Sequence, residues 1–371
     1  MHYTLHTLPQ LLLELQLIDT DALLFDDLEI TSINRRNKNL EVSTKAGQHW
    51  LVKQPSHASS ESVPTLRRES FFYHYCSQHL AEVADLIPTE AYSKPELPLL
   101  ILTFYPEALP LWRYYNSRGI DQFPTLTSGA VGSALGRLHR FFLSKDLRQD
   151  ARLDFIEDDL PFIFELHEPH PERLSYLKQG GCEYLRKLQS DQELVHAFRK
   201  AKALWNCQTL IHGDVKLDNF LALDPSKANC TDLKIVDWEM LQFGDTAWDV
   251  AGAFNDFVFW WVINMPDNVP PQEMLAQAKF PFQRLHPAVA AFWANYAEHL
   301  PPNVDEQLDF LARAITFSGL RTLQTAYEIA CKFDRIPPIA QLLYNLGQSV
   351  LKNPEKARES FFSLSLQTSA A

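Results

Sequence analysis

The chain has 371 residues, enough for one large domain or two modest ones, and 46% of them are hydrophobic, which is ample for a buried core. Its formal net charge is −12, which argues against a nucleic-acid partner because phosphate backbones are bound by basic surfaces. The charge is compatible with a cationic substrate, and equally with a solvated acidic surface.

The cysteines and the apolar segments indicate the compartment. The five cysteines are widely spaced without a Cys-x-x-Cys pair, which argues against a disulfide framework or a zinc site and is typical of a reducing cytoplasm. Glu14 interrupts the first apolar run, which also lacks a basic region, so no signal peptide is expected. Residues 257–266 are too short an apolar stretch to span a bilayer. We therefore expect a cytoplasmic protein with no membrane partner.

The first hundred residues predict a small sheet. Leucines at helical spacing predict a leading helix over residues 6–25. Three short segments within residues 28–55 are rich in β-branched residues and separated by turn residues, which predicts three consecutive antiparallel strands. A helix over 65–83 and two more strands within 91–109 follow. This part of the chain therefore predicts five strands and one helix.

The rest of the chain has mainly helical periodicity. Helices are expected at residues 125–144, 172–207, 245–263, 286–299, 305–332 and 337–351. Short strands are expected at 209–211, 220–223 and 232–239. The predicted class is α+β and bilobal, with a small five-stranded antiparallel lobe carrying one helix (residues 1–106) and a larger, mostly helical lobe (residues 107–371).

The loop "HGDVKLDN", residues 212–219, carries the most specific chemical signal. Asp214 could accept the proton of an attacking hydroxyl, and Asn219 could bind Mg²⁺, which prefers hard oxygen ligands. Asp237, at the end of an apolar strand, would be a second and stronger ligand. Phosphoryl transfer requires such groups to align the reactants and neutralise charge. The alternative is that Asp214 and Asn219 are ordinary turn residues.

Three motifs in order carry a resemblance to a known family. They are His-Gly-Asp-x4-Asn at 212–219, a short strand that ends in Asp-Trp-Glu at 235–239, and a Gly-Asp-x3-Asp helix start at 244–249. Together they resemble the aminoglycoside phosphotransferase and choline kinase family, which is related to protein kinases. The resemblance covers roughly residues 28–350 and is specific over 209–255. It implies a protein-kinase-like fold and a Mg²⁺-dependent kinase that transfers the γ-phosphate of ATP to a hydroxyl, with GTP left open as the nucleotide.

The resemblance also assigns roles to single residues. Asp214 resembles the general base, and Asn219 and Asp237 resemble the metal ligands. Lys53 resembles the third-strand lysine that holds the α- and β-phosphates, and Glu69 resembles its ion-pair partner on the helix. Seen alone, Lys53 and Glu69 would be interpreted as solvated surface residues; their order and context favour the functional interpretation.

Two further segments would contact the nucleotide. Thr103 to Tyr105 resembles the hinge that reaches adenine with backbone groups, with Thr103 and Tyr105 as the candidates. The first hairpin lacks the glycines of the protein-kinase phosphate loop. Side chains could meet the phosphates there instead, and Asn39 falls where family members often carry Asn; the candidates are Arg35, Arg36, Lys38 and Asn39.

Other residues near these motifs are expected to support them. His139 is predicted to be structural, and His212 to brace the catalytic loop. Asp245 and Asp249 are expected to fix the loop after the metal aspartate through backbone N–H groups at a helix start. Trp248 is expected in the core.

Lys216 bears on the acceptor. Small-molecule members of the family more often carry His near this place, whereas Ser/Thr protein kinases carry this Lys, where it stabilises the transferred charge. The motifs look closest to kinases of class V lanthipeptide and thioamitide pathways, which implies a precursor peptide as substrate and a partner lyase. A small hydroxylated molecule (an aminoglycoside, choline or a sugar) is the equal alternative. A catalytically silent pseudokinase is disfavoured, because all five expected site residues are present.

Overall fold

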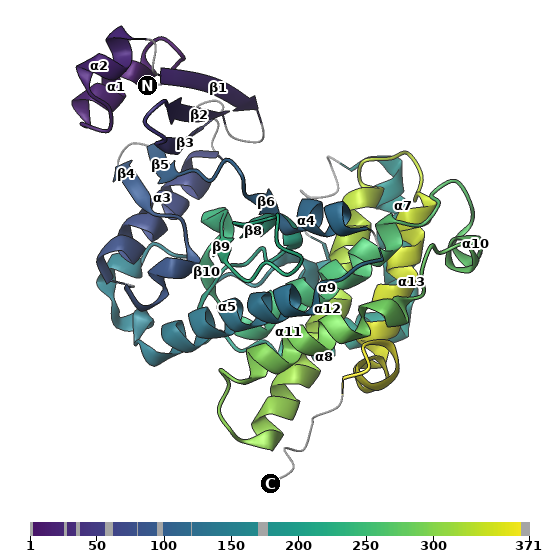
Figure 1. The fold of residues 1–371 in the computed structure, drawn as a ribbon. Helices are drawn as coiled ribbons and strands as arrows, with labels where there is room; N and C mark the ends of the chain where they lie inside the picture. The colour runs from purple at the N-terminus through teal and green to yellow at the C-terminus, as the bar shows by residue number, and fades with distance from the viewer. Residues whose placement is uncertain are drawn as a thin grey trace. The chain divides into compact units, whose positions relative to one another are not determined.

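The computed structural model describes residues 3–25, 28–34, 38–55, 62–79, 81–94, 99–119, 121–169 and 177–364 (Figure 1). The chain packs into two compact units, of which the first contains Met1–Pro110 and Asn219–Leu241 and the second contains Leu111–Asp218 and Gln242–Ala371. The chain therefore passes from one unit to the other at Asp218–Asn219, inside the loop at 212–219. The domain boundary predicted at residue 106 stays a prediction.

The first unit is built on a five-stranded antiparallel sheet with the order β1-β2-β3-β5-β4. The strands are β1 (Leu28–Asn34), β2 (Lys38–Thr44), β3 (His49–Gln54), β4 (Glu90–Lys94) and β5 (Leu99–Thr103). Gly47 closes the turn between β2 and β3 with a φ of 82°, a conformation that glycine adopts without strain. The five predicted strands and their antiparallel pairing are confirmed.

Helices cover the two faces of this sheet. On one face, Leu8, Leu11 and Leu12 form a core cluster with side chains of β2, β3 and β5. They belong to α1 (Leu8–Glu14), which is followed by α2 (Thr20–Leu24); α3 (Ser62–His79) packs against β4 and β5. The single leading helix predicted over 6–25 is wrong, because Gln16 has a φ of 57° and Asp19 caps a new helix at the backbone N–H of Ala22.

A second, three-stranded sheet completes the first unit. Its order is β6-β8-β9, formed by Leu109–Pro110, Phe220–Ala222 and Leu233–Ile235. A short 3-10 helix at Trp238–Met240 packs on α3, where the rings of Trp238 and Phe72 stack with centroids 4.0 Å apart. This contact holds the segment after β9 against the helix that carries Glu69.

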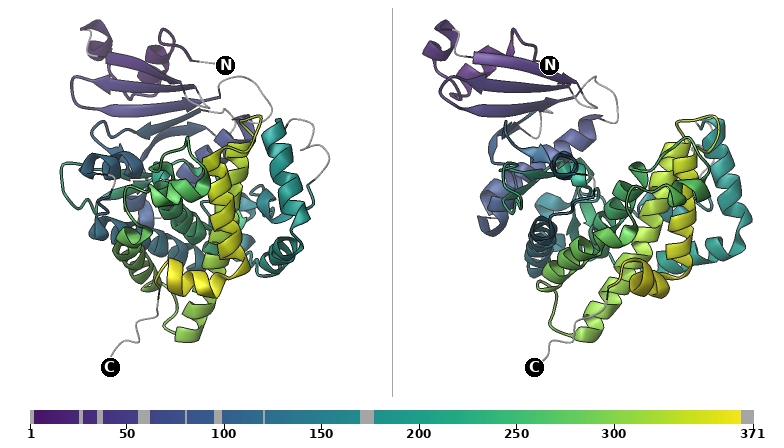
Figure 2. Two further views of the ribbon diagram at one scale, coloured as in Figure 1. Left: turned by 90° about the vertical axis from the view of Figure 1, so that its right-hand side faces the viewer. Right: turned by 45° about the vertical axis from the view of Figure 1, so that its right-hand side comes forward.

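The second unit is mostly helical. Its helices are α4 (Leu111–Arg118), α5 (Thr125–Ser144), α7 (Gln179–Ser190), α8 (Gln192–Ala203), α9 (Thr246–Ile263), α10 (Pro271–Ala276), α11 (His286–Ala297), α12 (Val304–Ala330), α13 (Pro338–Lys352) and α14 (Pro354–Lys356). α12 packs side by side with α13 and against α9, and α11 packs against α5 (Figures 1 and 2). The helix expected over 172–207 is two helices in the described part, because Asp191 caps α8 at the N–H of Leu194.

A short two-stranded ribbon in the second unit leads into the loop at residues 212–219, the predicted catalytic loop. β7 (Thr209–Ile211) pairs with β10 (Gln242–Gly244), which the sequence did not predict. Residues 209–211 are fully buried in this ribbon, so the polar loop begins directly after a rigid apolar strand. None of the helices in the described part of the chain has the length and apolarity needed to cross a membrane.

Candidate active site

In the first unit, three predicted site residues form one charged cluster. Lys53 Nζ lies 2.8 and 2.7 Å from the two carboxylate oxygens of Glu69 and 3.0 Å from Oδ1 of Asp237. Lys53 and Glu69 are buried, with 6% and 0% of their surface exposed. Burial alone would lower the pKa of Lys53, but the charges of Glu69 and Asp237 outweigh it and raise that pKa above its usual range. Lys53 therefore stays charged at every physiological pH.

Local structure explains why these residues meet. Lys53 is on β3, the middle strand of the sheet, and Glu69 lies on α3, which packs on the adjacent strands. Asp237 follows β9 with a φ of 68°, a left-handed backbone conformation that is uncommon for residues other than glycine and is found mostly where the surroundings enforce it.

Burial raises the pKa of Glu69 to about 7, although the Lys53 charge opposes this shift.

Asn219 is held beside the Asp237 segment. Its carbonyl oxygen accepts a hydrogen bond from the N–H of Val236 at 2.9 Å, and its side chain is buried. A carboxylate and an amide offer the hard oxygen atoms that Mg²⁺ prefers, and Mg²⁺ commonly uses one or two protein carboxylates together with water and substrate phosphates. In the described residues no three His, Cys, Asp or Glu side chains gather as a complete metal site. Asp237 and Asn219 are therefore the residues of this region whose oxygen atoms fit a metal that also binds nucleotide phosphates.

Asn39 is the hairpin residue that the structure places beside Lys53. The two residues are direct cross-strand partners, so their side chains share one face of the sheet. Asn39 is 8% exposed, and its Oδ1 has no hydrogen-bond partner among the described residues. A buried polar atom without a partner is unfavourable unless a ligand or water satisfies it. Arg35 and Arg36 lie outside the described residues, as does the side chain of Lys38.

The hinge candidates follow β5. The N–H of Thr103 donates to the carbonyl of Thr89 at 2.9 Å, and the N–H of Phe104 donates to that of His49 at 3.0 Å. A nucleotide base would therefore need other backbone groups of this segment. Tyr105 is partly exposed, with Lys234 Nζ 5.9 Å from its ring centroid. The hinge roles of Thr103 and Tyr105 stay predictions.

In the second unit, Asp214 is surrounded by cations. Lys216 Nζ binds Asp214 Oδ2, and the Nη2 of Arg321 lies 3.4 Å from Oδ1. Burial would raise the pKa of Asp214, but the charges of Arg321 and Lys216 together lower it below its usual value. Asp214 is therefore a carboxylate at neutral pH, as a proton acceptor must be.

A buried network fixes the backbone of the loop that carries Asp214. Asp249 accepts hydrogen bonds from the N–H groups of His212 (2.7 Å) and Gly213 (2.9 Å). His139 bridges Asp249 (3.1 Å) and the hydroxyl of Tyr296 (2.9 Å). Gly213 has a φ of 79°, which explains why glycine stands in the motif. His139 is thus structural, as predicted.

Two supporting roles differ from expectation or extend it. Asp249 accepts hydrogen bonds from the backbone of the loop at 212–219 and not from the loop after Asp237, so the predicted partner was wrong. The reason is that α9, which carries Asp249 near its start, packs against β7, the strand that leads into the loop at 212–219. Asp245 caps α9 at Ala247 and accepts the N–H of Asn206. His212 accepts the N–H of Asp214 at Nδ1, and Trp248 is buried, as expected.

The sequence interpretation missed Arg321 and Asp256. Asp256 accepts the N–H of Leu217 in the catalytic loop, and burial raises its pKa to about 7. A signal for Asp256 existed: it lies seven residues after Asp249, two helical turns along the same face, with Gly252 between them. A Cβ on Gly252 would lie 2.5 Å from the carbonyl oxygen of Val215, so this face packs tightly on the loop. No motif pointed to Arg321.

Comparison with family models decides the classification. The model of the phosphotransferase enzyme family matches residues 28–291, which is most of the chain. The chain belongs to the phosphotransferase enzyme family. The predicted resemblance and the prediction of a phosphotransferase enzyme are therefore confirmed, whereas the match does not address a lanthipeptide pathway.

Solved structures support the fold of this phosphotransferase. An amicoumacin kinase in complex with AMP-PNP, Ca²⁺ and Ami is 13% identical, with a TM-score of 0.54 and coverage of 89% of each chain. An ethanolamine kinase of Plasmodium vivax is 12% identical (TM-score 0.52; 93% of this chain, 89% of that chain). A choline kinase of Cryptosporidium parvum Iowa II is 13% identical (TM-score 0.50; 91% and 92%). The phosphotransferase has the kinase-like fold predicted; no curated protein matches it by sequence.

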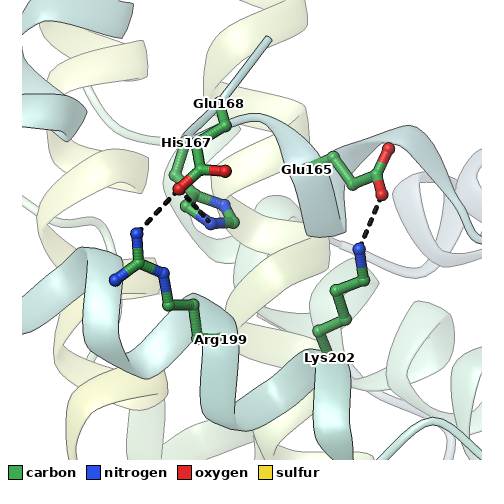
Figure 3. Close-up of a pocket in the computed structure, with 5 residues that line it drawn as sticks. All are labelled: Glu165, His167, Glu168, Arg199 and Lys202. Carbon is green, nitrogen blue, oxygen red and sulfur yellow. Dashed lines mark hydrogen bonds and ion pairs between the residues drawn. The ribbon is translucent and has the colours of Figure 1, made fainter.

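One pocket of this phosphotransferase lies in the second unit, apart from the predicted site residues. It measures about 330 Å³ and is lined by Glu165, His167, Glu168, Arg199 and Lys202 (Figure 3). Arg199 pairs with Glu168 and Lys202 pairs with Glu165, each at 2.7 Å. The charges that face this pocket are thus compensated within it, and none of the residues predicted to act on nucleotide or acceptor lines it.

Proposed function

We propose that this protein is a kinase that transfers the γ-phosphate of ATP to a hydroxyl group of its acceptor, with Asp214 as the general base. The observation that carries the proposal is the state of Asp214: Lys216 and Arg321 contact its two carboxylate oxygens and keep it ionised. An ionised carboxylate on a loop fixed by buried hydrogen bonds is the group that a hydroxyl nucleophile requires.

The nucleotide would be held by the cluster of the first unit. Lys53, kept charged and fixed by Glu69, would bind the α- and β-phosphates. The orphaned Oδ1 of Asn39 on the same sheet face offers an acceptor that a bound ligand or its water could satisfy. Asp237 and Asn219 would hold Mg²⁺, which neutralises phosphate charge when it is bound.

In the proposed transfer, the γ-phosphorus exchanges its bond to ADP for a bond to the acceptor oxygen. The acceptor hydroxyl gives its proton to the carboxylate of Asp214 as its oxygen forms a bond to the γ-phosphorus. The bond between that phosphorus and the β–γ bridging oxygen breaks, and the electron pair leaves with ADP. Lys216, beside Asp214, would counter negative charge on the transferred group.

Two acceptor classes have a specific observation each. The lysine at position 216 favours a Ser/Thr hydroxyl, and hence a ribosomally made precursor peptide whose phosphate a partner lyase would eliminate. The structurally similar kinases named for amicoumacin, ethanolamine and choline favour a small hydroxylated molecule. Both acceptors would meet the same base, so the chemistry at Asp214 does not depend on the choice.

An acceptor screen tests the function and separates the classes. The protein is incubated with ATP and Mg²⁺ and with either precursor peptides from neighbouring genes or a panel of aminoglycosides, sugars and amino alcohols. A mass gain of one phosphate on a peptide, lost when its leader segment is truncated, identifies the peptide class. Phosphorylation of a free small molecule, with every peptide unmodified, excludes it. Parallel reactions with GTP identify the nucleotide.

A further inference from the structure

Arg321 reaches the catalytic loop from a distant part of the sequence. It lies on α12, 107 residues after Asp214, and is 8% exposed. Its Nη2 is 3.4 Å from Asp214 Oδ1 and 3.4 Å from the carbonyl oxygen of Val215, and its guanidinium carbon is 5.0 Å from the ring centroid of Trp248. The guanidinium therefore contacts the side chain of one loop residue and the backbone of the next.

We propose that Arg321 is a positioning residue that aims the carboxylate of Asp214 and keeps it ionised. The inference rests on the proposed function, because it gives Asp214 the role of base. A planar guanidinium that packs on an aromatic ring has few accessible conformations. It can therefore fix the position of a carboxylate oxygen more precisely than a flexible lysine side chain can. Lys216 contacts the other oxygen but is 37% exposed at its side chain, so water weakens its hold.

A second acidic residue, Asp256, is close enough to Arg321 to be influenced by its charge. Asp256 on α9 lies near Arg321, Asp214 and Asp218, and its own pKa is raised to about 7 by burial. The titratable and charged groups that face Asp214 are Arg321 from α12, Asp256 from α9, and Lys216 and His212 from its own loop. Without Arg321, Asp214 would lose the cation at its Oδ1 and keep Lys216 at its Oδ2, while its burial would still oppose ionisation.

The first test measures the ionisation of the Asp214 carboxyl group directly, without an activity assay. The carboxyl carbons of aspartate are labelled with ¹³C, and the Asp214 signal is assigned by its loss in Asp214→Asn. In Arg321→Gln its titration midpoint should move to higher pH than in the wild type. Arg321→Lys, which keeps the charge, should move it less. Glu328→Gln, an exposed charge change on the same helix, should leave it in place. An unchanged midpoint in Arg321→Gln would overturn the proposal.

The second test separates positioning from stability. With an acceptor found in the screen, Arg321→Gln should lower kcat by about 10- to 100-fold and leave the KM for ATP unchanged. Combined with Asp214→Asn, it should cause no further loss, because its effect passes through that carboxylate. An equal loss in both backgrounds would contradict the proposal, as would failure of both Arg321 variants to fold. If the midpoint moves but Asp214→Asn retains turnover, the inference about Arg321 stands and the proposed base is wrong.

Discussion

Lys53 and Glu69 form a buried ion pair in which one ammonium group meets both oxygens of one carboxylate, at 2.8 and 2.7 Å. The same Lys53 ammonium group also donates to Oδ1 of Asp237 at 3.0 Å. A single cation thus compensates two acids, and its loss would leave charge buried without a partner. The cluster is consequently both a stabilising feature of the first unit and the expected phosphate-binding group.

Lys53→Met should therefore weaken folding as well as activity. Loss of one partner of a buried pair lowers the free energy of unfolding by about 3 kcal/mol. The loss should be smaller at pH 5 than at pH 8, because Glu69, with a pKa near 7 in the wild type, can then take up a proton. Urea denaturation at the two pH values measures this, with the exposed Lys45→Met as the control. Equal stability of Lys53→Met and wild type at pH 8 would contradict the account.

Asp214→Asn should leave the fold and the nucleotide affinity intact while turnover falls. Asparagine has the same shape but cannot accept the hydroxyl proton, and general-base catalysis contributes about 10²- to 10⁴-fold. Calorimetric titration with ATP and acceptor-dependent ADP release measure the two effects separately. Tenfold weaker ATP binding with unchanged kcat would place Asp214 in nucleotide binding instead.

Asp237→Asn should weaken Mg²⁺-dependent ATP binding by at least about tenfold, since even groups that only support metal ligands contribute 10- to 100-fold. Asn219→Ala should have a smaller effect, because a neutral amide binds the metal less strongly than a carboxylate does. Titrations with ATP in the presence and absence of Mg²⁺ measure how much the metal contributes to ATP affinity. The variant Asp232→Asn, at an exposed position, is the matched control. Identical Mg²⁺ dependence in all variants would argue against the metal site.

Asp256→Asn should change how stability depends on pH. Burial raises the pKa of Asp256 from 3.8 to about 7, so the folded state retains a proton that the unfolded chain releases in this window. The contribution of Asp256 to the free energy of unfolding of the wild type therefore falls as the pH rises from about 4 to 7, by on the order of 1 kcal/mol per pH unit. The amide oxygen of asparagine can still accept the N–H of Leu217, so the variant should gain relative stability as pH rises. Unfolding curves that stay parallel across this range would refute the assignment.

The sequence predicted those parts of the site whose neighbours are set by local pattern. Periodicity predicted the strand that carries Lys53 and the helix that carries Glu69, whereas their pairing was implied by the family resemblance. The loop at 212–219 was recognisable by its spacing alone. The strands β1 to β3 were predictable because they are short, rich in β-branched residues and bounded by turn residues, and β5 because it is a near-continuous apolar run.

The contact between Arg321 and Asp214 and the break between α1 and α2 could not be predicted from local sequence pattern. The helix that carries Arg321 was predicted over 305–332, but the face that it turns to residue 214 depends on its packing with α9 and α13. No periodicity within one helix specifies such a contact over 107 residues. The break between α1 and α2 depends on a backbone conformation at Gln16 and on a cap at Asp19, and both compete with the propensity of the leucine-rich run.

The most direct test of the central claim is the fate of the γ-phosphate. ³¹P NMR follows ATP and Mg²⁺ with the wild-type protein and with Asp214→Asn, each with the acceptors of the screen. The account predicts that the wild type forms ADP and a phosphate ester on an acceptor hydroxyl in equal amounts, and that Asp214→Asn forms the ester at least about 100-fold more slowly. No ester on any acceptor, or equal ester formation by both proteins, would contradict it.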